Sequence, residues 1–179
     1  MWKDILKVDE FTSEGGFKGL YDPREDKVKV NLDRFTTVAE GYEDIERVVE
    51  FANVVTHELS HREYSKELNE EMNKTLDELF EIVKKYAQET ELNNKQKTLK
   101  LIEKKYKIWL NYAIINESFA FGSGKSFERL SHLDGTRSSV RFVMGQVNEH
   151  LRKLVGKKDR QLEIMLDVLY SEAMRAIKK

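Results

Sequence analysis

His57 and His61 stand four residues apart, with Glu58 directly after the first, and together they make an H-E-x-x-H motif. On a helix, side chains four residues apart lie one above the other on the same face. Two imidazoles placed in this way can bind one tetrahedral zinc ion, and the glutamate between them can act on zinc-bound water. The spacing therefore predicts a metal centre with His57 and His61 as ligands.

The helix that must carry this motif is indicated by the hydrophobic pattern of residues 43–65. Apolar residues recur there at three- and four-residue spacing, which is the period of an amphipathic helix. At about 100° per residue, the apolar stripe centres on Ala52, Val55 and Leu59, and the two histidines fall on the opposite side. We expect one face to be buried and both imidazoles to face a cleft. A charged surface helix that carries two histidines by chance is the alternative.

A catalytic zinc site also needs a third protein ligand and an open position for water. The metzincin pattern has a histidine six residues after the second one, but Glu67 stands there. Residues 108–121 form an almost wholly apolar segment in which Glu117 is the only charged residue. An isolated buried carboxylate is costly, so we expect Glu117 to bind the metal. Pairing with an arginine or capping a helix is its alternative role, and His132 is the alternative third ligand.

The remaining pattern predicts a small sheet among helices. Alternation over 27–32 predicts a half-buried strand that pairs with 16–21 as a β-hairpin. Helical periods predict helices over these ranges: 43–65, 66–90, 96–121, 138–155 and 159–178. We expect a short helix or arm at 1–14, a turn at Asn93-Asn94 and a loop at 122–137. The predicted fold class is therefore α+β and predominantly helical.

The composition excludes several kinds of chemistry. The 179 residues include no cysteine and four histidines, so disulfides, thiolate metal sites and cysteine nucleophiles are ruled out. The formal net charge of -1 argues against a globally basic nucleic-acid binder. No segment resembles a signal peptide or membrane span. We therefore expect a cytoplasmic protein with peptide or protein partners, and a homo-oligomer is left open.

The segment GSGKS at 122–126 is similar to the end of a P-loop. It lacks the first glycine of that motif, because Phe119 stands in its place, and a predicted helix precedes it where a P-loop has a strand. The segment is therefore expected to be a loop after a helix, and no nucleotide site is predicted.

The order of a strand, the HELSH helix and a later helix with NESFA at 116–120 resembles the gluzincin zinc metallopeptidases. The short chain resembles the minigluzincins in particular, small archaeal members described as latent zymogens. The resemblance covers about residues 15–65 and 106–124. It implies a zincin-like core and a hydrolase, specifically a metalloprotease.

The resemblance also implies a role for each candidate site residue. Zinc would be the cofactor, held by His57, His61 and Glu117. Glu58 would be the general base that assists attack of zinc-bound water on a peptide bond. The strand at 27–32 would be an edge strand that binds extended peptide by β-augmentation, through Lys27, Val28, Lys29, Val30 and Asn31.

Two features of the site depart from the gluzincin pattern. Some gluzincins have an aspartate four residues after the glutamate ligand, where this chain has Phe121. No motif marks the group that stabilises the oxyanion. The candidates are Tyr112, His132, Arg137 and His150.

The chain is also longer than a minimal gluzincin. We expect a single domain over 1–179, with 66–105 as an inserted helical hairpin and 138–179 as a C-terminal helical extension. These additions favour either a zymogen whose last helices cover the site or, as an alternative function, a zincin-like binding or regulatory protein whose metal is structural or whose cleft is blocked.

Overall fold

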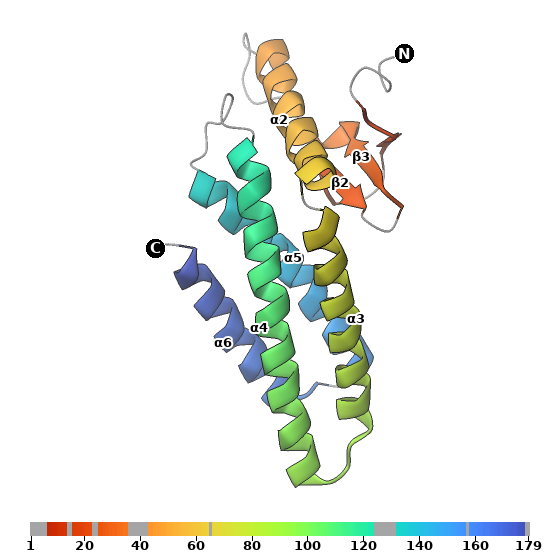
Figure 1. Cartoon of the computed structure of the whole chain (residues 1–179), viewed down its shortest axis with the longest axis vertical. Helices are drawn as coiled ribbons and strands as arrows, with labels where there is room; N and C mark the ends of the chain where they lie inside the picture. The colour runs from red at the N-terminus through yellow and green to blue at the C-terminus, as the bar shows by residue number, and fades with distance from the viewer. Residues whose placement is uncertain are drawn as a thin grey trace. The chain divides into compact units, whose positions relative to one another are not determined.

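The computed structural model describes residues 7–13, 16–22, 25–35, 43–64, 66–123, 132–156 and 158–177. Over these residues the chain is α+β and mostly helical, as the sequence predicts (Figure 1). It divides into two compact units. Unit 1 is Met1–Asn69 with Ser118–His132, and unit 2 is Glu70–Glu117 with Leu133–Lys179.

Within the described part of unit 1, the sheet has three strands, β1 (Glu10–Thr12), β2 (Gly19–Asp22) and β3 (Lys27–Asn31). Their order is β1-β3-β2, with β1 parallel and β2 antiparallel to β3. The predicted hairpin is thus present as β2 and β3. The 3-10 turn η1 (Leu32–Arg34) follows β3, and the Asn31 Oδ1 accepts a hydrogen bond from the Asp33 N–H at 3.1 Å.

Helix α2 (Glu43–Tyr64) packs on this sheet and completes the core of unit 1 (Figure 1). The alternation in β3 turns Val28 and Val30 inward, and both are fully buried. They meet Val55 on the predicted apolar stripe of the helix. Full burial of a side chain of this size contributes about 1.5–3 kcal/mol, so these contacts hold α2 in a defined rotation about its axis.

Unit 2 is built on helices α3 (Lys66–Gln88), α4 (Leu92–Ser123), α5 (His132–Val155) and α6 (Arg160–Ala176). Large side chains from all four share one core, and the most buried are Leu79, Tyr86, Ile102, Tyr106, Trp109, Met144, Leu151, Leu162, Leu166 and Leu169. No helix in the described ranges is both long and apolar enough to cross a membrane.

The helical additions predicted from the sequence make up most of unit 2. Apart from residues 66–69, the hairpin at 66–105 and the extension at 138–179 belong to that unit, together with 106–117 and 133–137. Helix α6 supplies three of its most buried leucines. The last helix is therefore an integral part of a hydrophobic core.

Asp159 forms the junction between α5 and α6. Gly156 adopts a left-handed φ of 72° after α5, a conformation that glycine adopts without steric cost. The Asp159 carboxylate then caps α6 by accepting the Gln161 and Leu162 N–H groups. It also accepts hydrogen bonds from the Tyr86 hydroxyl at 3.0 Å and the Lys95 ammonium at 2.8 Å.

Two predicted helix starts differ from the structure. Helix α4 begins at Leu92, not at Gln96, because Asn94 lies in its first turn and donates to the Glu91 carboxylate at 2.8 Å. Helix α5 begins at His132, inside the predicted loop, because its Gly135 and Thr136 are buried, and burial outweighs the cost of about 1 kcal/mol for a helical glycine.

The N-terminal prediction of a helix or arm also needs correction. Residues 10–12 are the strand β1, which pairs with β3 and places the Phe11 ring on the core of unit 1. Pairing with β3 and burial of an aromatic ring favour the strand over a helix here. Residues 1–6 and 14, and the GSGKS residues 124–126, lie outside the described part of the chain.

Candidate metal centre

The two motif histidines lie side by side on α2. Their Nε2 atoms are 3.1 Å apart, and their rings meet edge to face with 4.7 Å between centroids. His61 is buried and His57 is half-buried. Val55 packs on the sheet from one face of α2. Both imidazoles lie on the opposite face, as the sequence predicts.

Glu117 completes a three-residue cluster with these histidines. One ligand atom from each of His57, His61 and Glu117 can be chosen so that all lie within 4.8 Å of one another. Glu117 directly precedes Ser118, the point at which α4 enters unit 1. Because α4 continues unbroken to Ser123, Glu117 lies on the same helical turn as Ser118. The structure brings the three predicted ligands together.

The donor set fits a small divalent metal ion. Two neutral imidazole nitrogens and one carboxylate oxygen are the protein ligands of many catalytic zinc sites. Zinc–nitrogen bonds of about 2.0–2.1 Å in a tetrahedron separate two nitrogens by about 3.3 Å, close to the observed 3.1 Å. The same donors also accept other first-row ions, so the geometry indicates a metal and leaves its identity to measurement.

Phe121 occupies the position at which some gluzincins carry an aspartate. Its ring lies 4.3 Å from the His57 ring, centroid to centroid, at an interplanar angle of 51°. An aromatic contact therefore restrains this imidazole, and the residue that makes it stands where those gluzincins have a carboxylate.

Glu58 belongs to a row of side chains on α2 that contacts the β2–β3 hairpin. The row advances one helical turn at a time through Glu50, Val54, Glu58 and Arg62. The hairpin residues that it meets, in the same order, are Lys18, Gly19, Tyr21 and Asp26. The first and last contacts are ion pairs, and the two in the middle are a close packing contact and a hydrogen bond to the Glu58 carboxylate.

The hydrogen bond joins the Tyr21 N–H to the Glu58 Oε2 at 2.7 Å. Glu58 is buried, with 8% of its surface exposed. A buried carboxylate requires hydrogen-bond donors, and a main-chain N–H from β2 is one of them. The Tyr21 phenol donates to Asp26 at 3.1 Å, and burial together with this contact raises the pKa of Tyr21 to about 12.

The prediction that Lys27–Asn31 is an edge strand is wrong. β3 is the central strand and is paired on both sides, so its backbone groups are not available to an added peptide. Three of its side chains, Val28, Val30 and Asn31, are fully buried. Lys29 pairs with Glu10 and Glu25, and Lys27 also pairs with Glu25. The alternation was correct, but alternation does not reveal which strand lies outermost.

The oxyanion candidates other than His132 belong to unit 2. Tyr112 and Arg137 are half-buried residues of unit 2. The side chain of His132 lies outside the described residues, so its roles as third ligand or oxyanion group stay predictions. His150 is exposed on α5 of unit 2, and its ring lies 4.4 Å from that of Phe80.

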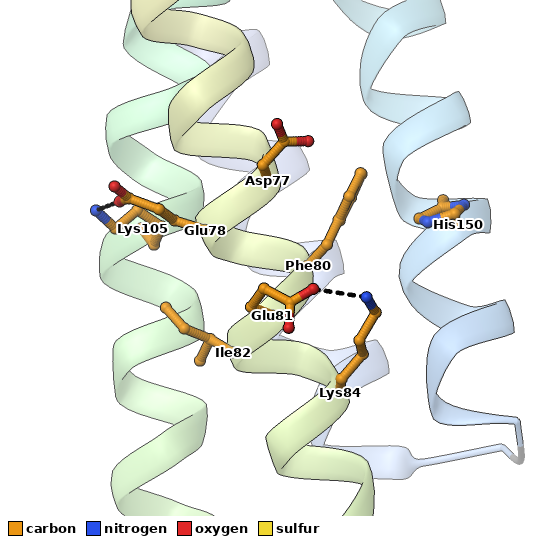
Figure 2. Close-up of a pocket in the computed structure, with 8 residues that line it drawn as sticks. All are labelled: Asp77, Glu78, Phe80, Glu81, Ile82, Lys84, Lys105 and His150. Atoms are coloured by element: carbon orange, nitrogen blue, oxygen red, sulfur yellow. Dashed lines mark hydrogen bonds and ion pairs between the residues drawn. The ribbon is translucent and has the colours of Figure 1, made fainter.

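An open hollow of about 690 Å³ lies in unit 2. Figure 2 shows His150 among the residues that line it. Carboxylates and lysines line most of the rest, and Glu78 pairs with Lys105 while Glu81 pairs with Lys84 at 2.6 Å. Four of its lining residues are thus paired charges, and Phe80 and Ile82 supply apolar surface. It adds no ligand to the histidine cluster.

Comparisons with known proteins assign no family to this chain. No protein-family model matches it, no curated protein matches it, and no solved structure matches it. The functional argument therefore depends on the cluster and its surroundings.

The sequence predicts a strand over 16–21 but not the contacts that Gly19 and Tyr21 of this strand make with Glu58. A glycine inside a strand does indicate close approach of another part of the chain, and Gly19 is such a case. The signal was present, but it does not say which element approaches.

Proposed function

We propose that this protein is a zinc-dependent peptidase in which His57, His61 and Glu117 hold the metal and Glu58 is the general base. The observation that supports it best is the convergence of two imidazoles and one carboxylate from two separate helices, with ligand atoms within 4.8 Å. H-E-x-x-H on a helix joined by a remote glutamate is the donor arrangement of such enzymes. The zincin-like character of the core is part of this proposal.

In this proposal the residues have distinct tasks. When bound, zinc supplies Lewis acidity that activates water and polarises a carbonyl group. The two histidines and Glu117 fix the position of the ion, and Phe121 limits rotation of the His57 ring. The Glu58 carboxylate takes the proton of the attacking water and passes it to the leaving amine. Its Oε2 is fixed by the Tyr21 N–H, so the carboxylate is oriented before substrate arrives.

The edge of the sheet nearest this carboxylate is β2. Since β3 is central, an extended peptide that approaches the metal would meet β2 and the row of α2 side chains beside it. Lys18 and Glu50 form an ion pair at one end of that row. Because the outward Tyr21 N–H of β2 is already donated to Glu58, we assign the peptide-facing surface to the α2 side chains beside β2, and not to Lys27–Asn31.

A second function has support in the burial of the site. Glu58 and His61 are only 8% and 6% exposed, and a metal centre enclosed in this way suits a latent zymogen or a binding protein with a structural metal. The last helix is an integral part of the core of unit 2. Removing it to expose the site is therefore expected to unfold that unit.

The test is hydrolysis of a mixed peptide library by zinc-loaded full-length protein and by Glu58→Gln, with zinc content measured on both. The proposal expects cleavage by wild type, a loss of at least about 10²-fold in kcat/KM for the variant, and equal zinc. Cleavage by Glu58→Gln at the wild-type rate would contradict it. Stoichiometric zinc with no cleavage by either protein would favour the structural or blocked site.

A further inference from the structure

Gly19 lies so close to α2 that any side chain there would force Val54 and Glu58 to move. A Cβ atom built on Gly19 would be 2.4 Å from Val54 Cγ1, 2.8 Å from Glu58 Cγ and 3.0 Å from Glu58 Oε1. Real Cβ atoms essentially never come within 3.0 Å of a heavy atom from a residue that is not their chain neighbour. The missing side chain thus sets how near β2 approaches the Glu58 side chain, and Gly16, which meets nothing within 4 Å, provides a contrast on the same segment.

The direction of the Tyr21 N–H follows from the strand register. The Asn31 N–H donates to the Lys18 carbonyl at 2.9 Å. Lys18 and Asn31, which lie opposite each other on the two strands, therefore form a hydrogen-bonded pair. Hydrogen-bonded and non-hydrogen-bonded pairs alternate along an antiparallel ladder. The Tyr21–Val28 pair, three positions on, is therefore non-hydrogen-bonded, and the Tyr21 N–H points away from β3.

That N–H points at Glu58. It donates to Oε2 at 2.7 Å, a short distance typical of a charge-assisted hydrogen bond. Gly19 and Tyr21 are two residues apart on one side of the strand, so the same edge that packs on the Glu58 methylene also bonds its carboxylate. Two independent contacts thus fix both the stem and the head of one side chain.

We infer that β2 positions the Glu58 carboxylate, with Gly19 setting its distance and the Tyr21 N–H setting its orientation. The inference deepens the proposed function, since it names the positioning residues for the proposed base. Gly19 and Tyr21 act through Glu58 and need not touch substrate. Orientation of a reacting group within about 1 Å is worth about 10²-fold in rate, so the contact has a measurable consequence.

The test separates packing from positioning with the variant pair Val54→Ala and Gly19→Ala/Val54→Ala. Removing Val54 Cγ1 relieves the shortest clash but leaves the new Cβ against Glu58 Cγ. We expect the double variant to fold and bind zinc like Val54→Ala, with kcat about 10²-fold lower and KM unchanged. Gly16→Ala is the matched glycine control and should keep wild-type kcat. Equal kcat in the double variant and Val54→Ala, or a change confined to KM, would overturn the inference.

A second readout needs no peptide hydrolysis. The Tyr21 amide proton should resonate downfield in the full-length protein and move upfield in Glu58→Ala and in Gly19→Ala/Val54→Ala. It should stay in place in Glu50→Ala, two turns away on the same row. If the Tyr21 amide chemical shift is unchanged in Glu58→Ala, the inference is overturned, whether or not the protein cleaves peptides. If wild type cleaves no peptide but the amide responds as expected, the proposed function fails and the contact between β2 and Glu58 stands.

Discussion

The ring of Phe121 packs on the imidazole of His57, with 4.3 Å between the ring centroids. The contact joins the last turns of α4 to the metal-binding motif on α2. It also places an aromatic ring four residues after Glu117, so one helix provides both a ligand and a support for another ligand. Mutation of a residue that orients a metal ligand typically lowers metal affinity by about 10- to 100-fold.

Phe121→Ala is therefore expected to weaken zinc binding by about tenfold or more, because the His57 ring loses the surface that limits its rotation. The measurement is zinc affinity by competition with a chromophoric chelator. Phe119→Ala is the control, since Phe119 is on the same helix and 59% exposed. Equal affinities for the two variants would show that the ring contact does not support the ligand.

Zinc is expected to raise the thermal stability of the protein, because a ligand that binds only the folded state stabilises it. The gain is about 2.7 kcal/mol at a free zinc concentration of 100 times Kd. Glu117→Ala should lose most of this gain, and chelation should return wild type to its metal-free Tm. Differential scanning calorimetry with and without zinc measures both.

The control for that experiment is Glu103→Ala, which removes an exposed carboxylate of α4 that pairs with Lys107. It should keep the full zinc-dependent shift. A shift of equal size in Glu117→Ala would remove Glu117 from the ligand set.

Leu166→Ala should destabilise unit 2 by about 2–5 kcal/mol, the range for creating a cavity in a packed core. Leu166 is 1% exposed, whereas Ile164 on the same helix is 55% exposed and should change stability by less than about 0.5 kcal/mol when replaced by alanine. Urea unfolding followed by Trp109 fluorescence in a Trp2→Phe background reports on unit 2. A small effect of Leu166→Ala would contradict the packing of α6.

The ionised Asp159 carboxylate should make unit 2 more stable at neutral pH than in acid. Burial raises its pKa, but the hydrogen bonds from Lys95, the Leu162 N–H and Tyr86 outweigh burial, so the pKa lies below the ordinary value of 3.8. The lowered pKa means that the stabilisation is complete above the unfolded-state pKa and is lost as pH falls through the folded-state pKa.

Asn caps a helix as well as Asp does, so Asp159→Asn removes only the charge. It is expected to cost about 0.5–1.5 kcal/mol at pH 7 through the weakened hydrogen bonds from Lys95 and Tyr86, and the difference from wild type should shrink in acid. Urea unfolding at a series of pH values measures it. Asp167→Asn, an exposed position on the same helix, is the control. A destabilisation by Asp159→Asn that is independent of pH down to the acid limit would contradict the charged cap.

The parts of the fold that sequence predicted are those with a strong local period. The stripe through Val55 and Leu59 placed α2 and the rotation of its histidines, because a long amphipathic helix has one low-energy way to meet a core. Glu117 could be predicted because a single charge in an apolar helix needs a partner.

What the sequence did not predict depends on contacts between distant segments. The order of the strands is one case: nothing in the alternation of Val28 and Val30 says that β1 pairs on the far side of β3. Helix α5 starts early because Gly135 is buried, a tertiary effect that outweighs its low helix propensity. The contact between Gly19 and Glu58 is of the same kind, since two elements must be placed before it exists.

The most direct test of the central claim is the zinc K-edge X-ray absorption spectrum of the full-length protein loaded with one equivalent of zinc. The account predicts a four-coordinate ion with two imidazole nitrogens at about 2.0–2.1 Å and oxygen ligands at about 2.0–2.2 Å. A spectrum that shows fewer than two imidazoles, or a protein that retains no zinc after dialysis, would contradict the metal centre of His57, His61 and Glu117.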